Sequence, residues 1–163
     1  MSAIEGTGIH ATAVVYGETG VLILGPSGSG KSALALALLG RARDIGVFGA
    51  LVGDDRVWTR AVAGRLVASG AKQLAGIIER RTVGLVSAPH EPFAVIGLSV
   101  ELRPRCGAWP RLPDEPGGVT IEGVRLPRLA LDSGGSAADQ AFAVDERLGT
   151  MAAAEAGAKR NFA

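Results

Sequence analysis

The sequence contains little cysteine, few aromatic residues, almost no net charge and no long apolar run. Its one cysteine, Cys106, cannot form an internal disulfide, and because no secretory signal opens the chain we expect a cytoplasmic protein. The apolar runs end well short of the ~20 residues that cross a bilayer, so no membrane segment is predicted. The 17 basic and 16 acidic residues leave a net charge of +1 without a long basic block, which argues against nucleic-acid binding.

Aromatic residues make up only 4% of the chain, so alanine, valine and leucine must fill most of the interior. Hydrophobic residues nevertheless reach 47% and charged residues 20%, a composition that argues against wholesale disorder. A chain of 163 residues can bury one sizeable core but is too short for two ordinary domains. We therefore expect a single domain over residues 1–163.

A glycine- and serine-rich turn lies between a short apolar run and a helix-forming run. Residues 21–24 are typical of a buried strand, and the alanine- and leucine-rich residues 33–39 are typical of a helix. The intervening pattern G-x-x-x-x-G-K-S predicts a phosphate-binding loop, whose backbone N–H groups surround phosphate oxygens at the helix N-terminus. The nucleotide-binding residues predicted from this pattern are Gly25, Pro26, Ser27, Gly28, Ser29, Gly30, Lys31 and Ser32.

Two side chains of this loop have predicted roles in nucleotide binding. Lys31 would reach the terminal phosphates, and the hydroxyl of Ser32 would hold Mg²⁺. The alternative is a glycine-rich strand-to-helix turn with a solvated lysine. Because a strand precedes the loop and a helix follows it, we favour nucleotide binding.

The segments around the loop predict an α/β fold with a mixed sheet. Residues 11–16 and 21–24 flank a turn and predict a hairpin before the loop, whereas in a parallel nucleotide-binding fold the loop follows the first strand directly. Further predicted elements are a helix over 31–43, strands over 48–52, 56–60, 65–67, 83–86 and 93–102, a helical turn around 73–75, and two strands within 119–131. Prolines and glycines between residues 103 and 118 predict a surface excursion.

The C-terminal residues 136–158 predict an alanine-rich helix. Ser136 is a suitable N-cap. An apolar stripe is expected along one side of this helix, formed by Phe142, Val144, Leu148 and Met151.

Asp54 and Asp55 follow the short apolar strand over 48–52, where acidic groups can meet a phosphate loop at neighbouring strand ends. One carboxylate would bind Mg²⁺ while the other accepts a proton from an incoming hydroxyl. The alternative is a turn in which both side chains bond to local backbone. The phosphate loop favours the first interpretation, but the sequence does not say which aspartate is the base.

Two further positions are candidates for the same site. His10 would tune a carboxylate if its strand lies beside the acidic pair, although a solvated histidine fits the spacing equally well. In the cluster Glu79-Arg80-Arg81, the glutamate could complete a metal shell and an arginine could offset charge on a phosphoryl group. From spacing alone, an ion-paired strand edge is favoured for this cluster.

The order of these motifs resembles the catalytic domain of HPr kinase/phosphorylase, over about residues 8–131. In that family a histidine precedes the phosphate loop, an Asp-Asp pair follows its helix, and a signature E-x-R-G-x-G comes next. The matching residues are His10, Gly25 to Ser32, Leu51 to Asp55, and Glu79 to Gly84, and residues 123–129 are similar to a stretch near the family's C-terminus.

The resemblance implies a phosphoenolpyruvate-carboxykinase-like P-loop fold and a bifunctional protein-serine kinase and phosphorylase. Such an enzyme uses ATP and Mg²⁺, acts on the phosphocarrier HPr of the sugar phosphotransferase system, and assembles as a hexamer. By position, the catalytic residues would be His10, Asp54, Asp55 and Arg81, and the metal would be held by Ser32, Asp55 and Glu79.

The sequence departs from the family pattern in three places. We expect no additional N-terminal domain in a chain of this length. Thr82 replaces the first glycine of the signature, and the residues from Leu131 to Gly135 replace an Arg-Pro-Gly-Arg-Asn-like loop. Two alternative functions therefore stay open, which are a P-loop kinase for a small hydroxyl metabolite and a nucleotide-sensing binding module.

Overall fold

The computed structural model describes residues 6–105 and 117–160. Most of the excursion expected over residues 103–118, including Cys106, lies outside this range. The elements in chain order are β1 (Thr7–Ile9), β2 (Ala11–Tyr16), β3 (Thr19–Leu24), α1 (Lys31–Ile45), β4 (Gly49–Gly53), β5 (Val57–Val62), β6 (Arg65–Gly70), the 3₁₀ turn η1 (Lys72–Leu74), β7 (Ile77–Arg80), β8 (Gly84–Ser87), β9 (Phe93–Arg103), β10 (Gly118–Ile121), β11 (Val124–Asp132) and α2 (Ala137–Arg160).

The main sheet is mixed, as the sequence predicted. Its strand order is β1-β5-β6-β9-β3-β2-β4, and β11 with its partner β10 joins along β9. The pairings of β9 with β3 and with β11 are parallel, whereas the other pairings in this sheet are antiparallel. The predicted hairpin over β2 and β3 is confirmed, with Ala11 opposite Leu24 and Tyr16 opposite Thr19.

The long strand β9 allows the sheet to curl. Its first half pairs with β6, from Phe93 to Ile96, and its second half pairs with β11, from Ser99 to Arg103. One edge of β9 thus serves two different strands, while the other edge pairs with β3. The strand that carries the phosphate loop is therefore central in the sheet and has a partner on each side.

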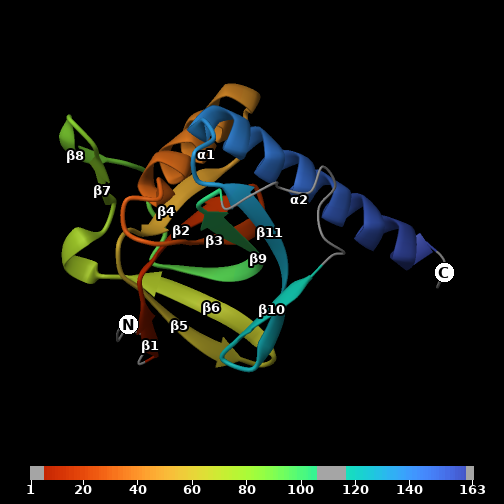
Figure 1. Cartoon of the computed structure of the whole chain (residues 1–163). Helices are drawn as coiled ribbons and strands as arrows, with labels where there is room; N and C mark the ends of the chain where they lie inside the picture. Colours follow the sequence, from red (N-terminus) through yellow and green to blue (C-terminus); the bar gives the residue numbers. More distant parts are fainter. Residues whose placement is uncertain (1–5, 106–116, 161–163) are drawn as a thin grey trace.

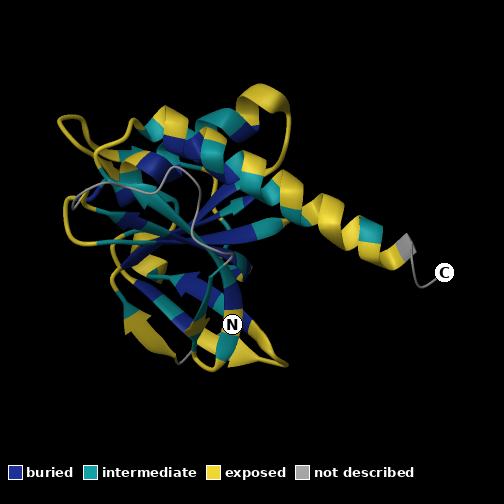
Figure 2. Ribbon diagram, turned by 45° about the vertical axis from the view of Figure 1, so that its right-hand side comes forward, coloured by how far each residue is buried: buried dark blue, intermediate teal, exposed yellow. Residues whose placement is uncertain are grey.

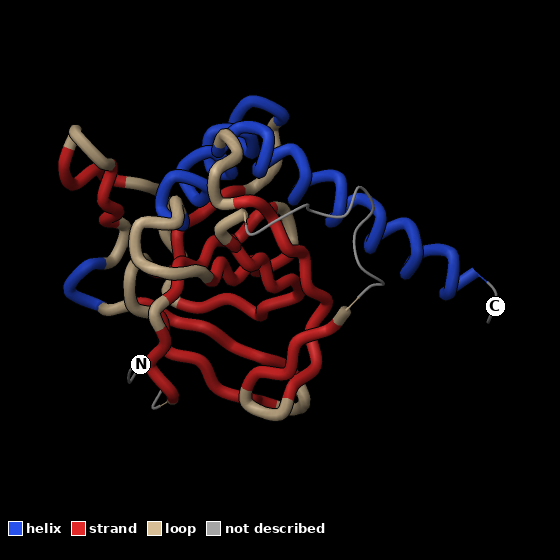
Figure 3. Tube along the Cα trace, viewed as in Figure 1, coloured by secondary structure: helices blue, strands red, loops and turns tan. Residues whose placement is uncertain are grey.

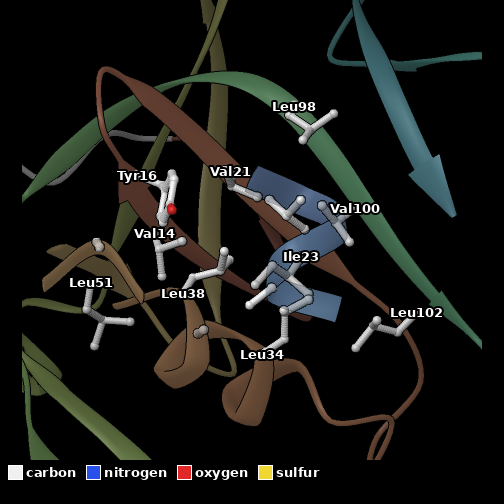
Figure 4. Close-up of a cluster of buried hydrophobic side chains, with 14 of the residues drawn as sticks. Val14, Tyr16, Val21, Ile23, Leu34, Leu38, Leu51, Leu98, Val100 and Leu102 are labelled. Carbon is white, nitrogen blue, oxygen red and sulfur yellow. The ribbon is translucent and has the colours of Figure 1, made fainter. Parts of the chain in front are cut away.

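Both helices cover the same face of the sheet (Figures 1 and 3). Leu34 and Leu38 of α1 pack against Val21 and Ile23 of β3 in a fully buried cluster (Figure 4), and Val144 of α2 joins them. Leu22 points to the opposite face, into a second cluster with residues of β5 and β6. This alternation along β3 is the period of two expected of a strand with both faces buried.

The C-terminal helix begins as predicted, with the Ser136 hydroxyl accepting a hydrogen bond from the Asp139 backbone N–H at 3.1 Å. Its predicted apolar stripe is wrong at Phe142, which is 52% exposed, whereas Val144 is fully buried. The ring of Phe142 lies instead under the guanidinium of Arg41, and Cζ of Arg41 is 3.8 Å from the centroid of the ring. The outer half of α2 extends away from the sheet and is largely exposed (Figure 2).

Two strands were missed by the sequence analysis. The first is β1, three residues that pair with β5 and place His10 in the link before β2. The second is β7, which pairs with β8 in a separate two-stranded sheet and carries Glu79 and Arg80. This hairpin stands beside α1 (Figure 1), and its Ile78 is buried in the same cluster as the α1 leucines.

Candidate active site

The phosphate loop connects β3 to α1 and adopts a conformation that only glycine tolerates at its start. Gly25 has a φ of 156°, and a Cβ there would lie 2.6 Å from the Ser29 hydroxyl and 2.9 Å from the Leu102 carbonyl oxygen. Gly30, the N-cap of α1, has a φ of 96°. Gly25 thus lets the loop backbone lie against Ser29 and Leu102, and the loop then leads through Gly30 into the helix N-terminus, where a phosphate can bind.

Lys31 is buried at the start of α1, with 6% of its surface exposed. Its ammonium lies 3.0 Å from the Gly25 carbonyl oxygen, 3.1 Å from the Pro26 carbonyl oxygen and 3.0 Å from Nε2 of His10. Burial lowers the pKa of Lys31 below its usual value, while the carboxylates of Asp55 and Asp54 act in the opposite direction. The three protons of the charged ammonium thus have three acceptors, which are the two loop carbonyl oxygens and Nε2 of His10.

The contact with Lys31 fixes the tautomer of His10. An ammonium only donates, so Nε2 accepts from Lys31 and Nδ1 carries the ring proton. Nδ1 lies 3.0 Å from the Asp55 backbone oxygen and 3.1 Å from Oδ1 of Asp55. His10 consequently connects the loop lysine to one of the two adjacent aspartates.

The other aspartate, Asp54, is held by three donors. The Ser32 hydroxyl lies 2.8 and 3.0 Å from its two carboxylate oxygens, the Thr12 hydroxyl donates at 2.7 Å, and the Glu79 backbone N–H donates at 3.3 Å. Ser32 is the loop residue that the sequence analysis assigned to Mg²⁺. A hydroxyl and a carboxylate side by side are oxygen ligands of the kind that Mg²⁺ prefers.

The structure therefore distinguishes the two aspartates, which the sequence could not. The predicted metal set was Ser32, Asp55 and Glu79, but it is Asp54 that lies on Ser32, while Asp55 turns to His10. Asp55 has a φ of 64°, so the chain turns through the left-handed region between the two carboxylates and sends them in different directions. Its side chain is 81% exposed and open to an incoming group.

Thr12 is the site residue that sequence reasoning missed. It is fully buried in β2 between Ala11 and Ala13, opposite Ile23. A threonine hydroxyl between two buried alanines of an apolar strand is the signal that could have identified it, because a buried hydroxyl needs a hydrogen-bond partner.

A cavity of about 720 Å³ unites these residues. It is lined by His10, Thr12, Ser27, Gly28, Gly30, Lys31, Ser32, Ala33, Leu36, Ala37, Asp54, Asp55, Glu79, Arg80, Arg81 and Ala137. The predicted loop, acidic pair, histidine and Glu79-Arg80-Arg81 cluster thus meet in one place. Arg81 reaches over the loop, because Nη2 of its guanidinium lies 3.8 Å from the position of a Cβ on Gly28.

The segment from Leu131 to Gly135, which replaces the basic loop of the family pattern, makes its polar contacts with nearby residues. Asp132 accepts a hydrogen bond from the Gly134 backbone N–H at 2.9 Å, and its Oδ2 lies 3.7 Å from Nε of Arg105. The Gln140 side chain donates to the Asp132 backbone oxygen at 2.7 Å. The Asp132 carboxylate is thus bound by its own turn and paired with Arg105, and among the described residues after 117 only Ala137, the first residue of α2, lines the cavity.

Among the described residues, no group of three histidine, cysteine, aspartate or glutamate side chains could hold a metal ion by itself. A metal at Ser32 and Asp54 would therefore draw its other ligands from water and from substrate phosphates, which is how Mg²⁺ is usually bound in phosphoryl-transfer sites. None of the described helices is long and apolar enough to cross a membrane.

Residues 3–91 match the family model described as the HPr Serine kinase C-terminal domain, which covers more than half of the chain. The chain belongs to this family. The predicted resemblance is confirmed, and His10, the phosphate loop, the acidic pair and the Glu79 cluster all lie within the matched residues. The departure at Thr82 also lies there, in a turn where it keeps a φ of 67°, the left-handed conformation that glycine adopts freely.

Curated relatives agree with this family. The chain is 38% identical over 84 residues to the HPr kinase/phosphorylase of Clostridium tetani and 36% identical over 80 residues to that of Clostridium botulinum, covering 51% and 49% of this chain. These matches span about a quarter of the relatives, 25% and 24% of their lengths.

A solved structure of the Hpr(Ser) kinase/phosphatase from Coxiella burnetii matches the fold with a TM-score of 0.73 at 24% identity. The match covers 89% of this chain and 98% of that one. It confirms the mixed α/β fold beyond the residues that the family model reaches.

Proposed function

We propose that this chain is the phosphoryl-transfer domain of a Mg-ATP-dependent protein-serine kinase that acts on HPr or a related phosphotransferase-system carrier. The observation that supports the proposal is that two adjacent carboxylates have different partners. Asp54 accepts a hydrogen bond from the loop residue Ser32, and Asp55 contacts His10. The names of the curated relatives support the reaction class and the acceptor. A cytoplasmic location would follow from such a substrate.

Asp55 is the base in this mechanism. Its exposed carboxylate takes the proton of the acceptor serine, whose oxygen then bonds to the γ-phosphorus while the bond from that phosphorus to the β–γ bridging oxygen breaks and ADP leaves. His10 donates from Nδ1 toward Asp55 and so holds the carboxylate in position. In the phosphorylase reaction an oxygen of inorganic phosphate bonds to the phosphorus of phosphoserine, the bond from that phosphorus to the serine oxygen breaks, and pyrophosphate leaves, while protonated Asp55 returns the proton to the departing serine oxygen.

The remaining residues neutralise charge. Lys31 lies at the loop end where terminal phosphates are bound, and Arg81 lies over Gly28, where its guanidinium would oppose charge on the transferring group. Ser32 and Asp54 would hold Mg²⁺, which supplies further neutralisation of phosphate charge when bound. The carboxylate of Glu79 lines the same cavity and is available to the metal's water ligands.

The test is transfer of labelled phosphate from ATP to purified HPr, with Asp55→Asn compared with Asp44→Asn, an exposed aspartate at the end of α1. We expect Asp55→Asn to reduce transfer by about 10²- to 10⁴-fold with ATP affinity retained, and Asp44→Asn to behave as wild type. Wild-type transfer by Asp55→Asn would overturn the assignment of the base. Turnover of ATP with a small hydroxyl metabolite but not with HPr would favour a metabolite kinase.

A second candidate function is a nucleotide-sensing module with little turnover. The observation that favours it is Asp132, an acidic residue bound within its own turn where the family carries a basic loop. ATP binding without transfer to HPr or to any metabolite would support this second function. We also propose, from the family resemblance, a homo-oligomer and in particular a hexamer, which light scattering of the purified protein tests.

A further inference from the structure

Strands β5, β6 and the first half of β9 have one face in the core and one face toward solvent. Val57, Leu66 and Ile96 are buried in the second apolar cluster, and the residues that alternate with them belong to the opposite face. In Figure 1 both helices lie at the top of the molecule, away from β5 and β6 at the bottom. What we call the outer face consists of Arg56, then Trp58, Arg60 and Val62 of β5, Arg65, Val67 and Ser69 of β6, and Phe93 and Val95 of β9.

The pairing register places two aromatic side chains near the middle of the outer face. Trp58 is opposite Ser69, which in turn is opposite Phe93, and facing positions in a sheet have Cβ atoms about 4.5–5.5 Å apart. Ser69 is only 4% exposed, the burial expected of a small side chain between two rings. The guanidinium of Arg56 lies over the Trp58 ring, with Cζ 5.6 Å from the ring centroid. Tryptophan and arginine are the residue types that contribute most to protein interfaces.

The charge of the outer face has one sign. Arg56, Arg60 and Arg65 are exposed, and none of them forms an ion pair with a residue that the structure describes. Strands β5 and β6 and the first half of β9 contain no aspartate or glutamate, and the flanking acids are Asp55 before Arg56 and the half-buried Glu91 before β9. Because the whole chain has a net charge of only +1, these arginines are a local excess of positive charge that favours an acidic partner.

The outer face begins beside the proposed base. Arg56 follows Asp55 directly, and Gly8, two residues before His10, is opposite Trp58. Strand β5 has six residues, so it extends roughly 17 Å from the site at about 3.3 Å per residue. A small hydroxyl metabolite bound at Asp55 is too short to reach along this strand, whereas a protein acceptor can contact Asp55 and the outer face together.

We propose that the outer face is the docking surface for the acceptor protein, which places acidic groups near its serine on the arginines and an apolar patch on Trp58. The proposal rests on the proposed function, because it takes Asp55 as the base and a protein serine as the acceptor. Trp58 and Arg60 do not line the cavity that contains the phosphate loop. They therefore set the affinity for the acceptor protein and leave ATP binding and the transfer step unaffected.

The experiment measures transfer of labelled phosphate from Mg-ATP to purified HPr over a range of HPr concentrations, together with ATP affinity by calorimetry. Arg60→Gln removes one exposed charge from the outer face. We expect it to raise KM for HPr about 3- to 10-fold and to leave kcat and ATP affinity unchanged. Its matched control is Arg125→Gln, an exposed arginine of strand β11, which leaves KM, kcat and ATP affinity as in wild type.

Salt and a second variant separate the charged contact from the apolar contact. The wild-type KM for HPr should rise between about 0.05 and 0.3 M salt, because exposed charges are screened, and this rise should be smaller in Arg60→Gln. Trp58→Thr keeps a residue with high strand propensity but removes the ring. We expect it to raise KM at least about tenfold and to keep the salt dependence of wild type.

The possible results distinguish the docking surface from the proposed function. A wild-type KM in both Arg60→Gln and Trp58→Thr, with transfer intact, would overturn the docking surface alone. Equal losses of kcat and ATP affinity in both variants would also overturn it, because the two residues would then act through the fold of the site.

Two other results concern the occupant of the outer face. A changed oligomeric state of Arg60→Gln in light scattering, with an unchanged KM for HPr, would assign the outer face to a second copy of the chain and overturn acceptor docking. Absence of transfer from ATP to HPr by wild type, with ATP still bound, would overturn the proposed function and the docking surface with it.

Discussion

Nζ of Lys31 lies 3.0 Å from Nε2 of His10 while it donates to two carbonyl oxygens of its own loop. The lysine that should bind terminal phosphates therefore lies against acceptors of its own loop and against His10. A bound nucleotide would replace carbonyl and imidazole acceptors by charged phosphate oxygens, which form stronger hydrogen bonds with an ammonium.

Replacement of this lysine tests its position directly. Lys31→Met keeps the aliphatic length but removes all three donors, so we expect affinity for ATP and for tripolyphosphate to fall by at least ~100-fold. Lys159→Met, on the exposed end of α2, is the control and binds both ligands as wild type does. Near-normal tripolyphosphate binding by Lys31→Met would show that the loop does not bind phosphate through this residue.

Asp54 and Asp55 should fail in different ways when each is changed to asparagine. Because Asp54 is bonded to Ser32 and Thr12, Asp54→Asn raises the Mg²⁺ concentration for half-maximal transfer by about 10- to 100-fold. Asp55→Asn lowers the maximal rate and leaves the Mg²⁺ dependence unchanged. Measuring the transfer rate as a function of Mg²⁺ concentration distinguishes the two variants. Identical Mg²⁺ dependence of Asp54→Asn and Asp55→Asn would contradict separate roles for the two aspartates.

The turn between β7 and β8 contains a strained threonine. Thr82 has a φ of 67°, a left-handed conformation that is costly for a β-branched residue. We expect Thr82→Gly to raise the free energy of unfolding by about 1 kcal/mol, because glycine adopts this conformation freely. Urea denaturation of Thr82→Gly and wild type measures this change in the free energy of unfolding.

The matched control for this change is Thr120→Gly in strand β10, where the threonine is exposed and is absent from the residues with positive φ. Glycine there loses strand conformation without relieving strain, so the free energy of unfolding falls by about 0.5–1 kcal/mol. Equal destabilisation by both changes would show that Thr82 is not strained.

Docking of α2 depends on an ion pair with α1. Nε of Arg41 lies 2.8 Å from Oδ2 of Asp145, and the Tyr16 hydroxyl donates to Oδ1 of Asp145 at 3.0 Å. Asp145→Asn removes the charge from this arrangement, and we expect the melting temperature to fall by a few degrees and α2 to become more sensitive to proteolysis. Glu155→Gln, on the exposed outer half of α2, is the control for loss of one carboxylate from the helix and should melt as wild type does.

A pH dependence of stability is expected from Glu101. Hydrogen bonding to Arg103 lowers the pKa of Glu101 below its usual value of 4.5, with a further contribution from the charge of Arg128, against the opposing effect of burial. A lowered pKa in the folded state stabilises the protein above pH 4.5 and loses this contribution as the pH falls through the folded-state pKa.

The variant Glu101→Gln measures this contribution. At pH about 7 it should be less stable than wild type by no more than about 1 kcal/mol, because the pair is partly exposed, and the difference should shrink as the pH falls below 4.5. Glu18→Gln, in the exposed turn between β2 and β3, is the control. A difference between Glu101→Gln and wild type that grows toward acid pH would contradict this sign.

Much of the fold was predictable because its signals are local. The hairpin before the loop, the helix after it and the serine cap of α2 each depend on residues a few positions apart, and all three are confirmed. The short strands β1 and β7 were missed, since neither has an apolar alternation long enough to indicate a strand. Both segments are strands because they form backbone hydrogen bonds with β5 and β8, and such pairing does not show in their own sequences.

The sequence by itself determined that a glycine-rich loop with Lys31 and Ser32 joins a strand to a helix and that two aspartates follow the next strand. Only the tertiary structure decided which aspartate meets Ser32, because that choice depends on the left-handed turn at Asp55 and on Thr12 from a strand that precedes the loop. It also decided that Phe142 lies on the surface under Arg41 rather than in the core. These contacts join residues far apart in the chain, and the packing of a curled sheet, which no local pattern specifies, brings them together.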